Sequence, residues 1–246
     1  MIKKRVEIGE TAATISCEER YLQPVIDGII SARKQITAYG RANPDFFLSL
    51  EPMDPEPGAP AIIRRMCISS GRSGTGPMSC VAGAVAAAGV QSAIEMGSEH
   101  CVVDNGGDLA MILKSPVSVG ILDSLESGFL PTVEVGPTGG AIIGICTSSG
   151  AYGHSISLGR ADSTTVMARD PILADALATA ACNACSEPSE IRNALRALQD
   201  FDEVIWAVAK IDGFIGTFGD MPRVKFTEKS RSGLTIHSAF RAEVPI

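Results

Sequence analysis

The stretch from Ser73 to Ile94 carries no charged residue, and it constrains the fold of this chain more than any other stretch. A span of this length raises the question of a membrane helix. However, it contains Pro77, Gln91 and several Gly and Ser residues, and its apolar residues are mostly Ala rather than Leu or Ile. Small side chains let neighbouring elements approach closely, so we expect a buried helix of a soluble protein that begins at Pro77 and ends near Gly97.

The charge balance restricts the expected partners and location. The chain of 246 residues has a formal net charge of −7, so nucleic acid, which needs a basic footprint, is not an expected partner. The N-terminal residues MIKKRVEIGE lack the apolar core of a secretory signal. The seven cysteines are odd in number and scattered through apolar stretches, as small buried hydrophobes of a cytosolic protein are. We expect a cytoplasmic protein with no membrane contact, and the sequence does not indicate its oligomeric state.

Strand-like segments come in pairs with helices between them, which predicts an α+β fold with a largely antiparallel sheet. Pro24 and the stripe of Val and Ile after it predict a helix that begins at Pro24 and ends at Gly40. Asp170 followed by Pro171 has the pattern of a helix N-cap and a first helical residue. Further helices are expected over 77–97, 170–185 and 188–198. Strands are expected over 2–16, 61–69, 100–103, 109–113, 163–168, 202–210, 213–219 and 223–226, with short broken strands over 117–145.

Two segments share the pattern C-x-S-S-G-x-x-G, one from Cys67 to Gly74 and the other from Cys146 to Gly153. Each is expected to follow a strand, and each precedes an Ala-rich helix. An internal duplication would explain the pattern, and so would chance, because Ser and Gly are common residues. We expect a single domain over residues 1–246, in which two related halves would meet near residues 115–145.

The residues Asn105-Gly106-Gly107-Asp108 stand between two apolar runs. An Asn-Gly pair favours the positive φ angles of a tight hairpin turn. The same glycines would let backbone N–H groups reach a ligand, with Asp108 accepting hydrogen bonds from it. Spacing alone favours the turn and leaves the ligand loop open.

Asp175 and Thr179 lie four residues apart on one face of the helix that starts at Asp170. Their neighbours are Ala and Leu, and a carboxylate in an apolar stripe is unfavourable unless it is paired or binds a metal. A carboxylate and a hydroxyl are oxygen ligands that suit Mg²⁺, with water and phosphate in the remaining positions. The alternative is that Asp175 points outward to solvent.

The stretch from Ile145 to Ser155 reads ICTSSGAYGHS and is rich in hydroxyl groups and glycine. A single histidine is more often a packed residue than a catalyst. A hydroxyl-rich loop without bulky side chains makes His154 a candidate general base. We expect this loop to form one wall of a ligand site.

Together, the segments VVDNGGDLAMIL, GICTSSGAYGHSISLGRADSTTVMA and ADALATAACN closely resemble the UPF0280 branch of the ApbE-like superfamily. The segment GPMSCVAGAVA is also similar to the Gly-Pro-Met segment of that branch. The similarity runs from about Pro44 to Asp220. It implies two related T-fold-like halves, a mostly antiparallel sheet with helices packed on it, and a site between the halves.

The resemblance also implies a chemistry. The better-understood relatives are FAD:protein FMN transferases, which bind FAD and Mg²⁺ and attach FMN to a Ser or Thr of a partner protein. By this resemblance Asp175 and Thr179 would bind Mg²⁺, and His154 would be the catalytic base. The residues that would bind FAD or another nucleotide are Asn105, Gly106, Gly107, Asp108, Thr147, Ser148, Ser149, Gly150 and Gly153.

This sequence differs from the transferases at two places that matter. Ser157 stands where they have an acidic residue, and Ala82 stands where they have a lysine. Two other functions therefore stay open. One is a non-catalytic accessory protein, because some similar proteins are associated with anaerobic sulfur assimilation into homocysteine. The other is a different small-molecule enzyme on the same scaffold, with Cys146 or Cys80 as the reactive group.

Overall fold

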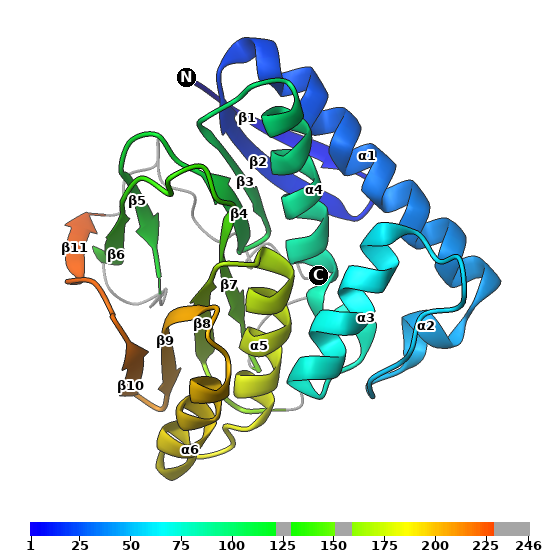
Figure 1. Ribbon diagram of the computed structural model, residues 1–246. Coiled ribbons are helices and arrows are strands. Elements are labelled where there is room, and N and C mark those ends of the chain that lie inside the picture. The colour runs from blue at the N-terminus through cyan, green and yellow to red at the C-terminus, as the bar shows by residue number, and fades with distance from the viewer. Residues whose placement is uncertain (122–128, 151–158, 229–246) are drawn as a thin grey trace, which may run out of the picture.

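The computed structural model describes residues 1–121, 129–150 and 159–228. Its main feature is one large sheet whose neighbouring strands are all antiparallel (Figure 1). In hydrogen-bonded order its strands are β1 (Ile2–Ile8), β2 (Thr11–Cys17), β3 (Cys101–Asn105), β4 (Asp108–Ile112), β7 (Ile143–Ser148), β8 (Ser163–Ala168), β9 (Val204–Ile211) and β10 (Phe214–Gly219). A second sheet has the order β11 (Lys225–Glu228), β6 (Phe129–Val135) and β5 (Val117–Gly120).

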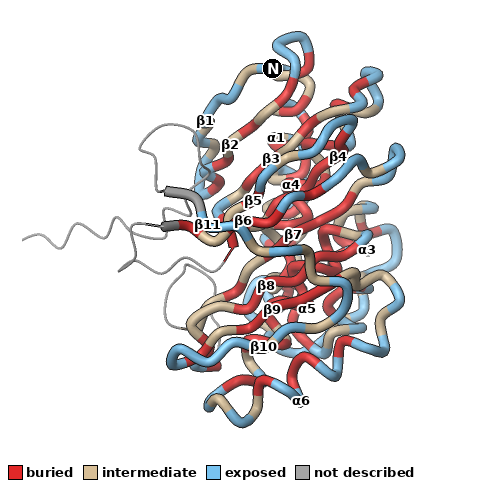
Figure 2. Tube along the Cα trace, turned by 90° about the vertical axis from the view of Figure 1, so that its left-hand side faces the viewer, coloured by how far each residue is buried: buried red, intermediate tan, exposed pale blue. Residues whose placement is uncertain are grey.

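The helices lie on one face of the large sheet, and the small sheet lies on the other (Figures 1 and 2). The α-helices are α1 (Glu19–Ala42), α2 (Asp45–Leu48), α3 (Ala61–Ser73), α4 (Val81–Glu95), α5 (Pro171–Asn183) and α6 (Ile191–Arg196). Three short 3₁₀ turns complete the described elements: η1 (Pro77–Cys80), η2 (Pro188–Glu190) and η3 (Ala197–Asp200). The predicted α+β class with a mostly antiparallel sheet is confirmed.

Apolar side chains fill both interfaces of this three-layer arrangement, as the alternation of side chains along a strand requires. On the helix side, Ile29 of α1 and Val90 of α4 belong to the same buried cluster as Val103 of β3. On the other side, Met111 of β4 packs in one cluster with Val133 of β6. The central strands of the large sheet are therefore covered on both faces, whereas the edge strands β1 and β10 keep exposed residues.

The large sheet consists of two successive units with the same order of elements. The first contains β1, β2, the helices α1 to α4, β3 and β4, and the second contains β7, β8, α5, α6, β9 and β10. The pairing of β4 with β7 joins them. This arrangement agrees with two related halves, while their origin by duplication stays a prediction. The shared C-x-S-S-G pattern does not mark equivalent positions, because Cys67 lies in α3 and Cys146 lies in β7.

The strand predicted over 61–69 is wrong, because this segment is the helix α3. Its buried residues include Ile63, Met66, Cys67 and Ser70, which follow the three-to-four-residue spacing of a helix rather than alternation. Two helix starts also differ from prediction. Helix α1 begins at Glu19, so Pro24 lies inside it, and Pro77 opens the turn η1 before α4 begins.

Helix α4 is the interior helix that its uncharged sequence predicts. Together with η1 it forms the segment Pro77–Glu95, which is long and apolar enough to cross a membrane by length and composition, and more than half of its apolar window is buried inside the protein. It contacts α1, α5, β3 and β4. Its glycines permit these contacts, since a methyl group at Gly89 would lie 3.1 Å from Ile29 Cγ1. The location of the protein in the cell stays a prediction.

Candidate functional site

Helix α5 begins as its sequence predicts. The carboxylate of Asp170 accepts a hydrogen bond from the backbone N–H of Ile172 (2.9 Å), and Pro171 is the first helical residue. This N-cap sets where the helix begins. Two polar residues within α5 face the interior.

Asp175 and Thr179 are these two residues, and only 7% and 6% of their surfaces are exposed. The alternative that Asp175 points to solvent is therefore wrong. Its Oδ2 accepts a hydrogen bond from the backbone N–H of Gly83 in the first turn of α4 (2.8 Å). Thr179 Oγ1 donates to the backbone carbonyl of Ser79 (3.2 Å). Both polar groups of α5 thus contact the segment that leads into α4.

The hairpin between β3 and β4 brings a second carboxylate to this region. Gly106 and Gly107 have φ angles of 69° and 112°, so the predicted tight turn is confirmed. The backbone N–H of Gly107 donates to Asp104 Oδ1 (2.9 Å). The side chain of Asn105 donates to the backbone carbonyl of Ala82 (3.2 Å), which ties the hairpin to the start of α4. The hairpin is therefore a tight turn, and it also lies beside the candidate site.

The charge of Asp108 acts on Asp175 across this cluster. Burial of its carboxyl group raises the pKa of Asp108 to about 7. A hydrogen bond from the backbone N–H of Thr147 has the opposite, smaller effect and lowers this pKa. Burial raises the pKa of Asp175 well above its ordinary value, and the charge of Asp108 raises it further. No lysine or arginine in the described part of the chain offsets these effects. The cluster therefore favours a bound proton or a bound cation.

Cys146 also belongs to this cluster, although no binding role was predicted for it from the sequence. It is fully buried, and its thiol donates to the backbone carbonyl of Pro171 (3.5 Å). Burial and the nearby charges of Asp108 and Asp175 raise its pKa well above the ordinary value. Burial likewise raises the pKa of Cys80. Because the thiolate is the nucleophile, these environments argue against the reactive-cysteine alternative.

The hydroxyl-rich segment is described as far as Gly150. Thr147 Oγ1 lies 2.9 Å from Thr165 Oγ1, and Ser149 Oγ donates to the backbone carbonyl of Asp162 (2.7 Å). Ser148 Oγ is buried without a hydrogen-bond partner among the described residues. The register partner of Ser148 on β8, Thr164, has a hydroxyl in the same situation. Gly153 and His154 lie outside the described residues, so their predicted roles stay predictions.

Gly83 and Gly150 have structural roles that the sequence pattern did not show. A methyl group at Gly83 would lie 2.6 Å from the carbonyl oxygen of Pro171. One at Gly150 would lie 2.0 Å from the carbonyl oxygen of Gly159. Both positions therefore require glycine for close backbone approach. At Gly83 this approach is what brings the start of α4 within hydrogen-bonding distance of Asp175.

The donor set of the cluster limits the cation that it fits. Within the described ranges, no three His, Cys, Asp or Glu side chains gather in a group that could hold a metal ion. The available groups are two carboxylates, the hydroxyl of Thr179 and backbone carbonyls, all of which are oxygen donors. Mg²⁺ is commonly bound by one or two carboxylates, water and substrate phosphates. The cluster therefore fits Mg²⁺ with a phosphorylated ligand better than it fits zinc.

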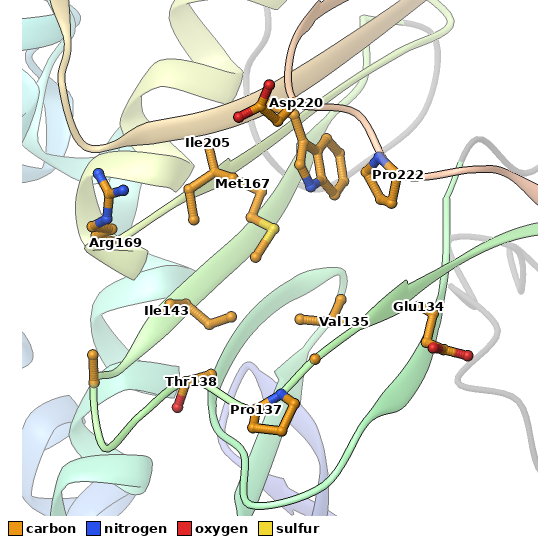
Figure 3. Close-up of a pocket in the computed structure, with 13 residues that line it drawn as sticks. Glu134, Val135, Pro137, Thr138, Ile143, Met167, Arg169, Ile205, Asp220 and Pro222 are labelled. Atoms are coloured by element: carbon orange, nitrogen blue, oxygen red, sulfur yellow. The ribbon is translucent and has the colours of Figure 1, made fainter.

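A separate pocket of about 350 Å³ lies at the beginning of β7. Thr147 lies at the other end of this strand, and Gly150 lies just beyond that end. Figure 3 shows the apolar side chains of Val135, Ile143 and Met167 in this pocket. None of the residues predicted from the sequence to form the site lines this pocket. It is therefore distinct from the carboxylate cluster.

Comparison with known proteins identifies the family. A family model described as AbpE bacteria matches residues 3–204. A UPF0280 protein of Methanothrix thermoacetophila is 38% identical over 92% of this chain and 95% of its own length. This chain belongs to the UPF0280 family. A second family member, from Methanospirillum hungatei, is 38% identical over 95% of this chain and 94% of its own length.

Solved structures show the fold of the family. The ApbE protein of Thermotoga maritima superposes with a TM-score of 0.55 at 14% identity, over 87% of this chain and 96% of the other. The flavinyl transferase ApbE of Pseudomonas stutzeri, in its apo form, gives 0.51 at 14% identity, over 88% of this chain and 93% of the other. This chain therefore has an ApbE-like fold, as the resemblance of its sequence motifs predicts.

Proposed function

We propose that this chain binds a flavin or another nucleotide together with Mg²⁺, with Asp108, Asp175 and Thr179 at the metal end of the site. The observation that carries this proposal is the carboxylate of Asp175, which is buried in α5, accepts a hydrogen bond from the backbone N–H of Gly83, and experiences the charge of Asp108 on β4. A buried carboxylate beside a second negative charge is unfavourable unless a proton or a cation neutralises it. Mg²⁺ held between such groups and a pyrophosphate would be such a cation.

The surrounding polar groups support a ligand beside the carboxylates. The hydroxyls of Ser148 and Thr164 are buried without a hydrogen-bond partner among the described residues, and buried polar atoms are normally satisfied by protein, water or a ligand. A methyl group at Gly106 would meet no atom within 4 Å, so the hairpin tip is open. Asn105 holds the first turn of α4 against the hairpin. These groups could contact the nucleotide on both sides of the metal end.

The finer proposal is transfer of FMN from FAD to a Ser or Thr hydroxyl of a partner protein. The acceptor oxygen would bond to the FMN-side phosphorus while the pyrophosphate P–O bond breaks, and AMP would leave with that electron pair. The hydroxyl proton would pass to a base, for which the family resemblance proposes His154. Mg²⁺ would supply neutralisation of the pyrophosphate charge. The described residues would hold and orient the ligand: Asp108 and Asp175 as anionic oxygen donors, and Thr179 as a neutral one.

The test is a calorimetric titration of the purified, ligand-stripped protein with FAD, with and without MgCl₂. We expect Mg²⁺-dependent binding that Asp175→Asn weakens at least tenfold, because the amide keeps the size of the carboxylate and removes its charge. Asp27→Asn is the matched control, since Asp27 is exposed on α1. Unchanged Mg²⁺-dependent affinity in Asp175→Asn would reject the metal assignment. If wild-type protein bound FAD under neither condition, the accessory-protein alternative would be favoured.

Transfer is tested separately by mass spectrometry of a Thr-containing acceptor protein after incubation with FAD and MgCl₂. We expect a covalent FMN adduct and a matching amount of AMP. Binding of FAD without AMP release, across a panel of acceptors, would restrict the function to nucleotide binding.

A further inference from the structure

Cys17 and Cys101 lie directly opposite each other where β2 pairs with β3. Cys17 is the last residue of β2 and Cys101 is the first of β3, and neither has any exposed surface. Directly opposed residues of antiparallel strands have Cα atoms about 4.5 or 5.5 Å apart. Disulfides bridge Cα separations of about 4.4–6.8 Å. The strand register therefore already places the two residues at the separation that a disulfide requires.

The two thiols also interact with each other. A hydrogen bond with Cys101 is the largest influence on Cys17 and lowers its pKa, whereas the same contact raises the pKa of Cys101. Opposite shifts of this kind arise when two thiols share one hydrogen bond, so the two sulfurs lie in contact. The thiolate is the form that attacks a disulfide. A thiolate at either position would therefore have a second sulfur beside it.

The remaining cysteines differ from this pair. All seven are buried and none forms a disulfide in the structure, but Cys80 and Cys146 donate to backbone carbonyl groups. Burial raises the pKa of Cys185 to about 11. Among the paired strands of the described residues, only Cys17 and Cys101 are cysteines in register with each other. Within the described strands, two cysteines therefore face each other at one position of the sheet only.

We propose that Cys17 and Cys101 form an oxidisable pair that a low-molecular-weight disulfide converts into a covalent bond between β2 and β3. The thiolate of one of the two cysteines attacks one sulfur of the oxidant, which forms a mixed disulfide and releases one small thiol. The thiolate of the other cysteine then attacks the protein sulfur of the mixed disulfide, and the second small thiol leaves. The protein loses two electrons and two protons, and the oxidant is reduced to two thiols. Access requires local opening of the hairpin of β1 and β2, which forms one edge of the sheet.

The position of the bond determines what it changes. It would close a covalent loop that contains α1, α2, α3 and α4, and it would fix the edge hairpin to the strand that leads to Asn105. Asn105 lies at the opposite end of β3 from Cys101. Oxidation should therefore raise the resistance of the fold to unfolding and leave ligand binding unchanged. This outcome does not depend on the proposed nucleotide site.

The experiment is incubation of the folded, full-length protein with oxidised glutathione, followed by alkylation and non-reducing peptide mass spectrometry. We expect a Cys17–Cys101 linked peptide, loss of two of the seven titratable thiols, and a rise in Tm on the order of 5–10 °C that dithiothreitol reverses. Cys17→Ser should abolish the link and the shift, with Cys17→Ala as a second variant if the first folds poorly. Cys185→Ser is the matched control and should retain both.

Two results would overturn the proposal. One is a link between other cysteines, or none, in protein that remains folded during the incubation. The other is a Cys17–Cys101 link that forms only when denaturant is added, since the folded register would then have no part in the reaction.

Discussion

Substitution of Gly83 by alanine tests the contact on which the candidate site depends. The added methyl carbon would lie 2.6 Å from the carbonyl oxygen of Pro171 and 2.9 Å from Cβ of Asp175. Favourable separations between non-bonded carbon atoms are about 3.5–4.0 Å, so α4 and α5 must separate locally by roughly 1 Å. Overpacking of this kind destabilises by about 1–3 kcal/mol, and the better helix propensity of Ala offsets up to about 1 kcal/mol.

The expected result for Gly83→Ala is a net loss of about 1–2 kcal/mol, which lowers Tm by roughly 2–8 °C for a chain of this length. The 2.8 Å hydrogen bond from Gly83 to Asp175 lengthens as the helices separate, so Mg²⁺-dependent FAD affinity should fall as well. Thermal unfolding followed by circular dichroism measures the change in Tm, and calorimetric titration measures the change in FAD affinity.

Gly71→Ala is the matched control, because Gly71 also lies in a helix and a methyl group there meets no atom within 4 Å. This variant should gain about 0.5–1 kcal/mol from helix propensity alone. The two identical substitutions should therefore change Tm in opposite directions. If Gly83→Ala were as stable as Gly71→Ala and bound ligand like the wild type, the close approach of α4 and α5 would have no energetic significance.

Three further predictions concern the polar groups of the cluster. The pKa of Asp108 is about 7 in the folded protein against an ordinary value of 3.8, so the folded state binds more protons. The contribution of this group to the free energy of unfolding should thus fall as pH rises from about 4 to 7. Denaturant titrations in Mg²⁺-free buffer at several pH values should show this fall. In Asp108→Asn the free energy of unfolding should depend less on pH over the same range. Thr179→Val keeps the shape of the side chain and removes its hydrogen bond to Ser79. It should cost about 1 kcal/mol and weaken Mg²⁺-dependent FAD binding in calorimetry, and intact binding would remove Thr179 from the metal end. Asn105→Ala removes the bond to Ala82 and should also cost about 1 kcal/mol in chemical denaturation, so an unchanged midpoint would show that this amide does not hold the start of α4.

Local sequence signals predicted the elements whose structure local chemistry determines. Asp170 and Pro171 predicted the start of α5 because an N-cap and a proline act within a single turn. The segment from Ala61 to Ser69 was mispredicted because a short apolar run fits a strand and a helix equally well unless its period is counted. The three- and four-residue spacing of the apolar residues Ile63, Met66 and Cys67 is the sequence signal that would have corrected it.

The candidate site was predicted only in part, for a related physical reason. The four-residue spacing of Asp175 and Thr179 predicts one face of a helix, but it does not say what that face meets. The hydrogen bond of Asp175 joins residues 92 positions apart, and its electrostatic interaction with Asp108 depends on the packing of α5 against the sheet. Such contacts come from the tertiary arrangement and leave no periodic trace in the sequence. Resemblance to a family, rather than pattern, brought these residues together before the structure did.

The central position of α4 also has a consequence for synthesis of the chain. This helix is complete at Glu95, but one of its covering elements, α5, ends only at Asn183. At usual elongation rates the ribosome needs on the order of 5–20 s to make the intervening residues. During that time an uncharged apolar helix lacks part of its final cover. The nascent first half should therefore be the stage at which this protein depends most on chaperones.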